Sequence, residues 1–198
     1  MRFFPKRFLC SVTTFICLSA VSWLQADETT SKPDPEVRGT KVNGVYDGKV
    51  EIWSTPTVKQ TAGGFANGEP DGTWTFWDES GTKIVEFNYQ LGPFTGAVTM
   101  WYDTSAGPRI RGKIKFRGSF DDGMWAGSVL TYYPDGKMRS ERVYTDGVVT
   151  QSYAYNPRGQ TLSEEDAKRV ATEDESTDNA YVDALDEFIR KWACADAE

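Results

Sequence analysis

Short runs of alternating polar and apolar residues, separated by turn-forming residues, fill the middle of the chain. Residues 73–77 alternate threonine with tryptophan and phenylalanine, residues 78–81 are polar and end in glycine, and residues 83–89 are rich in β-branched and aromatic side chains. Residues 129–133 and 138–144 repeat this order around a Pro-Asp-Gly turn. A period of two is typical of β-strands, and such turns are typical of hairpins. The pattern predicts successive β-hairpins.

One frame recurs along residues 41–160. Its five units start at Lys41, Phe65, Tyr89, Phe120 and Tyr144, so successive starts are 24, 24, 31 and 24 residues apart. A glycine stands three residues after every start, and a second glycine stands seven residues after the first four. Twelve residues after the first four starts stands an aromatic residue, and these form the aromatic row: Trp53, Trp77, Trp101 and Tyr132. Self-similarity at such a period indicates a repeat architecture, although the fifth unit is degenerate.

The two faces of the predicted sheet differ in polarity. Within the frame, offsets nine and eleven are mainly apolar, as at Trp74 and Phe76, whereas offsets eight and ten are mainly polar, as at Thr73 and Thr75. Alternate residues of a strand face opposite sides, so one face should be buried. The aromatic row is in phase with the polar side. Cross-strand packing is the favoured interpretation of this row, and stacking on sugar rings is the alternative.

The frame resembles a known family. The pattern aromatic-x-x-Gly-x-x-x-Gly followed by Trp or Tyr-Tyr, as in residues 120–127 with Tyr132 and Tyr133, is similar to the bacterial variant of the MORN repeat. The resemblance covers about 120 of the 198 residues. It implies an elongated antiparallel sheet of successive hairpins that acts as a scaffold or binding surface, and it supplies no catalytic residues. Some bacterial relatives carry an antitoxin label.

The expected fold is therefore mainly β: an elongated antiparallel meander of MORN-like β-hairpin repeats over residues 41–162, with C-terminal capping helices. Two strands for each of five units give about ten strands. Residues 163–198 change in composition and carry twelve acidic and four basic residues. A capping box at residues 163–166 predicts a short helix, and residues 178–193 predict a second, amphipathic helix. A cap on the sheet is favoured for it, and a partner-binding or dimerising helix is the alternative.

The first residues of the chain describe a targeting segment. Residues 1–26 combine a basic start with a short apolar run, which is typical of a signal peptide cleaved near Ala26, and an uncleaved membrane anchor is the alternative. Residues 27–40 are expected to be a disordered leader. The protein is therefore expected to be exported, either to the periplasm or outside the cell. Cys194 is the one cysteine that remains after cleavage, so no internal disulfide is expected.

Charge and composition exclude several classes of function. The chain has 22 basic and 29 acidic residues, and removal of three basic residues with the signal gives a formal charge of −10. This balance disfavours nucleic-acid binding. The chain contains no histidine, so the common hydrolase triads and His-ligated zinc are absent. We expect no cofactor, no metal and no enzymatic activity, although carboxylates such as Glu86, Asp121 and Asp122 leave a glycosidase as an alternative.

The third unit contains a seven-residue insertion with alternating cations. A strand through this segment would place five cations on one face, and these form the basic stripe: Arg109, Arg111, Lys113, Lys115 and Arg117. A solvated strand face, balanced by Glu86 and Glu141 in neighbouring units, is favoured over an anion-binding strip.

The expected function is a binding or scaffolding module outside the cytoplasm. Its partner is expected to be a protein or an anionic surface, either lipid headgroups in peripheral contact with a membrane or a polysaccharide, and homodimerisation remains open. The alternatives are a carbohydrate-active protein, as a sugar-binding module or glycosidase, and an immunity or antitoxin-type protein.

The export hypothesis predicts where the native chain begins. We expect N-terminal sequencing of the protein isolated from its natural source to start at or near Asp27, because the apolar run is too short to span a bilayer. A cytosolic protein that starts at Met1 or Arg2 would contradict export.

Overall fold

The computed structural model describes residues 34–193. The predicted signal peptide at residues 1–26 with its cleavage point near Ala26, residues 27–33 of the leader, and Cys194 lie outside the described residues. Of the described residues, Asp34 and Pro35 precede the first strand.

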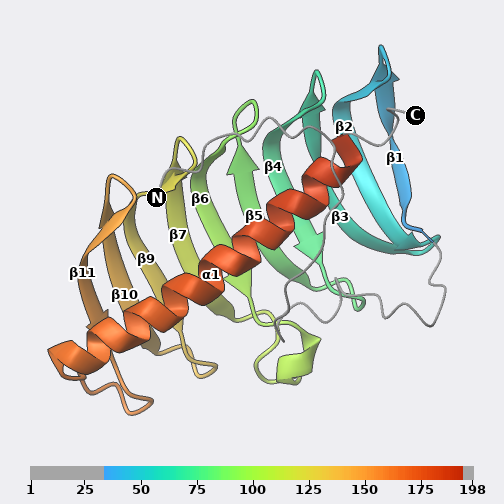
Figure 1. Ribbon diagram of the computed structural model, residues 1–198. Coiled ribbons are helices and arrows are strands. Elements are labelled where there is room, and N and C mark those ends of the chain that lie inside the picture. The colour runs from blue at the N-terminus through green and yellow to red at the C-terminus, as the bar shows by residue number, and fades with distance from the viewer. Residues whose placement is uncertain (1–33, 194–198) are drawn as a thin grey trace.

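Hairpin after hairpin forms one open antiparallel sheet, as Figure 1 shows. The strands are β1 (Glu36–Val42), β2 (Val45–Thr55), β3 (Val58–Ala66), β4 (Glu69–Trp77), β5 (Lys83–Tyr89), β6 (Phe94–Trp101), β7 (Ile114–Asp121), β8 (Met124–Trp125), β9 (Gly127–Tyr132), β10 (Met138–Thr145) and β11 (Val148–Ala154). Neighbours in the sheet follow chain order, except that the two-residue β8 pairs only with β7. The predicted meander of β-hairpin repeats is confirmed.

The sheet has ten strands along its path, but they are not distributed as predicted, with two strands for each of the five units. Units one to four supply β2 and β3, β4 and β5, β6 and β7, and β9 and β10. The extra strand is β1, which pairs with β2 from Glu36 onwards, so the prediction of a disordered leader is wrong for residues 36–40. The fifth unit supplies β11 alone. Backbone pairing to β2 orders a segment whose composition alone resembles a linker.

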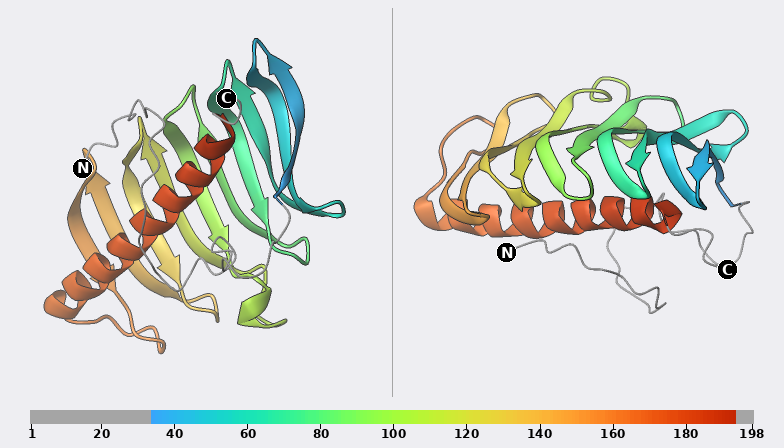
Figure 2. Two further views of the ribbon diagram at one scale, coloured as in Figure 1. Left: turned by 45° about the vertical axis from the view of Figure 1, so that its right-hand side comes forward. Right: turned by 90° about the horizontal axis from the view of Figure 1, so that it is seen from above.

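A single helix follows the sheet. It is α1 (Glu164–Ala193), so the prediction of two helices is wrong. The Ser163 Oγ accepts a hydrogen bond from the backbone N–H of Asp166 at 3.2 Å and caps the start. No glycine or proline interrupts residues 164–193, and this continuity allows one 30-residue helix. Figure 2 shows α1 running obliquely over one face of the sheet, from β11 towards β3.

The core lies between this helix and the sheet face predicted to be apolar. Trp74 and Phe76 are fully buried, whereas Thr73 between Gly72 and Trp74 is exposed, which agrees with the expected facing. From the helix, the buried apolar side chains are Ala167, Ala171, Val182, Leu185 and Ile189, and the last three belong to the main core cluster. The Phe76 ring lies 5.9 Å from that of Phe188. The helix is therefore the second layer of the fold and covers the apolar face.

Candidate functional site

The structure places the aromatic row at equivalent positions near the ends of β2, β4, β6 and β9. All four side chains are half-buried. Trp53 is paired with Lys59, and Trp77 with Lys83, each at a shift in the strand register. The shift brings a lysine of the following strand beside the ring. Sequence alternation predicted the row but not these lysine neighbours.

Cations of the same chain lie over the rings of the row. The Arg38 guanidinium is 4.4 Å from the centroid of the Trp53 ring. The Lys59 ammonium is 5.8 Å from that centroid and 4.8 Å from the centroid of Trp77. Lys83 lies 5.0 Å from Trp101. Such contacts contribute about 0.5–1 kcal/mol each at exposed sites.

These cations are themselves paired with carboxylates. Arg38 lies 2.8 Å from Glu36, and Lys59 lies 3.1 Å from Glu51. Lys83 lies 2.8 Å from Glu86. A row in which protein cations lie against Trp53, Trp77 and Trp101, and carboxylates neutralise those cations, favours the packing interpretation over the stacking of sugar rings on this face.

The basic stripe does not form one strand face, so that prediction is wrong. The twelve-residue segment between β6 and β7, residues 102–113, contains the seven-residue insertion. It forms a short helix, η1 (Thr104–Ala106), followed by turns that carry Arg109, Arg111 and Lys113. Gly107 and Pro108 precede the alternating pattern and Gly112 lies within it, and both glycines have positive φ.

The two remaining cations of the stripe, Lys115 and Arg117, lie on β7, and their side chains have different surroundings. Met100 pairs with Phe116 and Trp101 with Ile114, so Lys115 is the extra residue at a register shift. It lines a cavity with Tyr181 of α1. Arg117 pairs with Thr99 and Leu130, in the predicted row between Glu86 and Glu141.

A buried ionic cluster joins the sheet to α1. Asp174 accepts hydrogen bonds from the Ser140 hydroxyl at 2.7 Å and forms an ion pair with Arg139 at 2.9 Å. One turn later, Asp178 pairs with Arg142, whose side chain is 1% exposed. Removing one partner of a buried pair leaves an uncompensated charge and is strongly destabilising. Asp174 and Asp178, two of the twelve acidic residues of the C-terminal segment, therefore hold the helix on the sheet.

Two further hydrogen bonds fix the position of the helix along the sheet. The Trp125 indole N–H donates to Asn179 Oδ1 at 2.7 Å. The Tyr89 hydroxyl donates to Asp186 at 2.7 Å. The spacing of Asp174, Asp178 and Asp186 by four and eight residues places them on one side of a helix, and this signal was available in the sequence.

The insertion forms one wall of a cavity of about 600 Å³. The other walls come from the ends of β2 to β6, from Lys115 of β7 and from Tyr181 of α1. Its lining is mixed, and the aromatic residues are Trp77, Trp101, Tyr102 and Tyr181. The carboxylate of Asp78 accepts a hydrogen bond from the Thr104 backbone N–H at 3.1 Å and anchors the insertion to the preceding unit. A cavity of this size is within the range of small-ligand sites.

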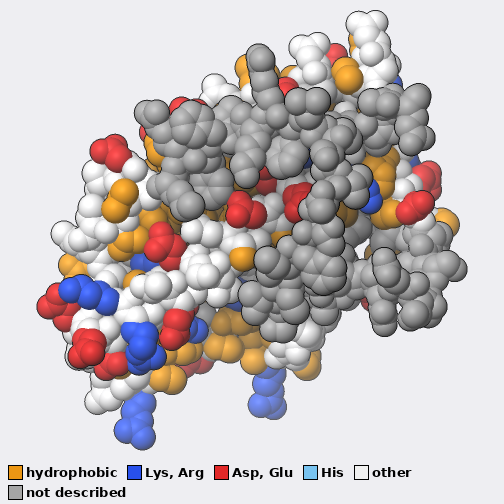
Figure 3. Space-filling view, in the orientation of Figure 1, with side chains coloured by type: hydrophobic (Ala, Val, Ile, Leu, Met, Phe, Trp, Pro, Cys, Tyr) orange, Lys and Arg blue, Asp and Glu red, His pale blue; other side chains and the backbone are white. Residues whose placement is uncertain are grey.

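Polar groups in this cavity remain available. Within residues 34–193, no hydrogen bond reaches the Tyr181 hydroxyl, and burial, with the nearby charge of Asp103, raises the pKa of Tyr181. Lys115 and Asp103 also line the cavity, and Oδ1 of Asp103 already accepts hydrogen bonds from the backbone N–H and the hydroxyl of Ser105. Figure 3 shows the face that carries α1: acidic side chains recur along the helix, and Lys and Arg side chains project from the lower edge of the molecule.

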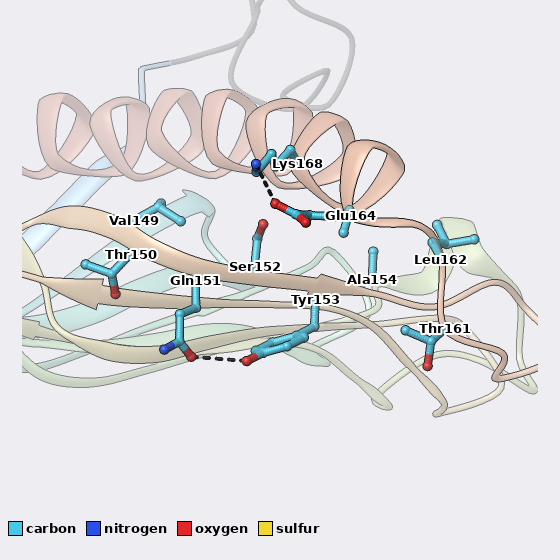
Figure 4. Close-up of a pocket in the computed structure, with 11 residues that line it drawn as sticks. Val149, Thr150, Gln151, Ser152, Tyr153, Ala154, Thr161, Leu162, Glu164 and Lys168 are labelled. Carbon is cyan, nitrogen blue, oxygen red and sulfur yellow. Dashed lines mark hydrogen bonds and ion pairs between the residues drawn. The ribbon is translucent and has the colours of Figure 1, made fainter.

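A second hollow of about 530 Å³ lies at the opposite end of the sheet, along β11 and the first turns of α1. In Figure 4, Ser152 points towards the helix, and Gln151 and Tyr153 point away from it. Lys168 lies 2.7 Å from Glu164 beside this hollow, so its nearest charges are neutralised.

The carboxylates considered for glycosidase chemistry do not converge. Glu86 pairs with Lys83 in the row of Arg117, and Asp121 lies four residues further along β7. At about 3.3 Å per residue, Asp121 is displaced from the row of Glu86 by roughly 13 Å along the strand direction. The two catalytic carboxylates of a glycosidase lie about 5–9.5 Å apart. Among the described residues, no group of three or more Cys, Asp or Glu side chains is placed to hold a metal ion. The described part of the chain also has no helix long and apolar enough to cross a membrane.

The fold and these surfaces define a β-repeat protein. Residues 70–91 and 127–146 match the model of a family described as the MORN repeat variant. They contain the hairpins of the second and fourth units, so the resemblance to this repeat is confirmed there. MORN repeats are generally binding or scaffolding modules and are typically non-enzymatic.

Other comparisons add little. No curated protein matches the chain. Among solved structures, the chain is similar to one entitled "Crystal structure of accessory secretory protein 1,2 and 3 in Streptococcus pneumoniae", with 9% identity and a TM-score of 0.34. The match covers 63% of this chain and 21% of that chain. A likeness this weak carries no argument about fold or function.

The ionic cluster predicts a pH dependence of stability. Burial raises the pKa of Asp178 to about 6, although Arg142 and Lys115 oppose the shift and Asp174 adds to it. Because the folded pKa exceeds the unfolded one, the stabilisation is present below the unfolded pKa and is lost as pH rises through about 6. We expect the free energy of unfolding to fall by about 1 kcal/mol from about pH 5 to about pH 7 through this group.

Urea unfolding followed by tryptophan fluorescence at the two pH values measures this difference. The variant Asp178→Asn should lose this part of the pH dependence, because its side chain does not titrate. An unchanged pH dependence in the variant would show that another group is responsible.

Proposed function

We propose that this protein is an exported, non-enzymatic binding module that attaches to an anionic polysaccharide through the insertion and the cavity beside it. The observation that carries the proposal is the insertion itself. It breaks the 24-residue period, adds three exposed cations at Arg109, Arg111 and Lys113, and forms a cavity wall. A segment that interrupts a structural repeat is not required for the packing of that repeat, which favours a functional role.

The lining of the cavity suits a saccharide. The rings of Tyr102 and Tyr181, which are not part of the aromatic row, would contact the apolar face of a sugar, and the side chains of Asp103 and Lys115 would pair with its hydroxyl groups. The Tyr181 hydroxyl supplies a further group without a partner among the described residues. The cations of the insertion would add attraction to carboxylate or sulfate groups of the polymer, and this attraction weakens with salt.

The test compares two triple variants that change the net charge equally. In the first, Arg109, Arg111 and Lys113 become serine. The control replaces three cations outside the insertion with serine: Lys41, Lys49 and Arg158. Binding to immobilised alginate, a polymer of uronic acids, is measured at low and at physiological salt.

We expect the insertion variant to bind alginate at least tenfold more weakly at low salt and the control variant to bind like the parent. Both should unfold at the same denaturant concentration as the parent, since surface charges contribute about 0–1 kcal/mol each. Tyr181→Phe should also weaken binding without loss of stability. Absence of binding at low salt, or equal loss in both triple variants, would contradict the proposal. If the parent protein bound anionic lipid vesicles but not alginate, the ligand of the insertion would be lipid headgroups instead.

A further inference from the structure

The second strand of the fifth unit is present only as its first two residues, Thr161 and Leu162, before α1 begins. Tyr155 pairs with Thr161 in an isolated bridge, as Tyr132 pairs with Met138 in the fourth unit. The turn between them is closed by a hydrogen bond from Asn156 N to Gln160 O at 2.9 Å. The Leu162 N–H then donates to the Ala154 carbonyl at 2.9 Å. The chain has thus started an antiparallel strand on the outer edge of β11.

Local sequence explains why this strand stops. In the fourth unit, the residues after the bridge continue as Ser140 to Tyr144 within β10. At the corresponding place in the fifth unit stand the cap Ser163 and the acidic residues 164–166, which favour the first turn of a helix over a strand. The chain therefore leaves the sheet for α1. The remainder of β11 has no strand partner on its outer edge among residues 34–193.

The two edges of the sheet differ in how they are protected. The β1 edge carries Glu36, Arg38 and Lys41 and has a register irregularity near Gly39. Charges and bulges of this kind normally prevent the addition of another strand. In contrast, β11 reads VVTQSYA, without a charge, glycine or proline. Its Val148 and Tyr153 are 59% and 44% exposed. Its register against β10 shifts at Thr150, between Val149 and Gln151, so residues 151–154 are the part of the β11 edge that lacks the features that block strand pairing.

The hollow along β11 follows this open edge. Its lining includes six consecutive residues, 149–154, which alternate between the two faces of the strand, so the hollow follows the backbone rather than one face. One side is bounded by Ala167 and Lys168 of α1, and one end by Leu162. Figure 4 shows the helix above the strand, with Ser152 between them. An edge strand beside a helix provides backbone hydrogen bonds and a side wall for an extended peptide.

We propose that the open edge of β11 binds an extended peptide segment of a partner protein, which takes the position of the missing second strand of the fifth unit. The small side chains of Ser152, Ala154 and Ala167 favour small residues on the side of the peptide that faces α1. The uncharged edge favours an uncharged, β-branched segment. A second copy of this chain fits less well, because its β1 edge would bring Glu36, Arg38 and Lys41 against β11.

The direction of the backbone groups identifies a residue for the test. The Ala154 carbonyl faces outwards, since it accepts from Leu162. The N–H and C=O of one residue in an antiparallel strand point the same way, and alternate residues share that direction. The N–H of Ser152 therefore faces the open edge. Proline at this position removes an outward donor and leaves the hydrogen bonds to β10 in place.

The probe is a fluorescein-labelled peptide with the sequence of residues 58–66 in which threonine replaces Lys59, so that the segment is uncharged and more β-branched. This is the second strand of the first unit, and its residues on the helix-facing side include the small Thr61 and Gly63. Fluorescence anisotropy measures its binding to the full chain and to the variants Ser152→Pro and Ser152→Ala. The alanine variant is the matched control, because it loses the same hydroxyl group and keeps the N–H.

We expect saturable binding to the parent and to Ser152→Ala, and at least tenfold weaker binding to Ser152→Pro. A peptide N-methylated at alternate residues along one edge should fail to bind the parent, which keeps the test valid even if the proline variant does not fold.

No saturable binding to the parent, or binding unaffected by N-methylation along either edge, would overturn the proposal. A concentration-dependent dimer that Ser152→Pro abolishes, seen by sedimentation velocity without peptide binding, would assign the edge to a second copy. Alginate binding through the insertion is unaffected by either result, because the two sites lie in different parts of the sheet.

Discussion

A single-layer sheet has two faces, and one face of this sheet is too apolar to remain in water. The constraint on the whole structure is therefore the covering of that face by α1. The repeat frame places Trp74, Phe76 and their equivalents on one side of the sheet, where they cannot bury one another completely. Leu185 and Ile189 of the helix are almost wholly buried against this side. The helix thus supplies the half of the core that the repeats cannot provide.

The position of the helix depends on polar contacts as well as on burial. Apolar packing alone is non-directional, whereas a buried pair such as Asp178 with Arg142 is stable only in one arrangement. We infer that the ionic cluster selects the position at which α1 crosses the sheet. The acidic composition of the last 36 residues is explained in part by this contact, because Asp174 and Asp178 face the sheet.

Much of the fold could be predicted from the sequence, because the repeat frame acts locally. The period of two assigned the faces correctly at Thr73 and Trp74, and the glycines marked the crossings between hairpins. Predictions failed where long-range contacts decide. The strand β1 forms because β2 offers an edge, and one helix forms because the core lies along its whole length. The five cations were placed on one strand because alternation was extended from Arg109 through Gly112, where the backbone turns. The cavity could not be predicted, since its walls come from three parts of the chain.

The central claim is that the sheet depends on α1, and amide hydrogen exchange of a full-length variant tests it most directly. Leu185→Asp combined with Ile189→Asp would place two charges in the core face of the helix, where unpaired charges are strongly disfavoured. Mass spectrometry of the exchanged protein then reports the protection of each strand. We expect protection to be lost in β4, β5 and β6, which carry the apolar face, and not in α1 alone. Strands that remain as protected as in the parent, with only α1 exchanging faster, would contradict the claim.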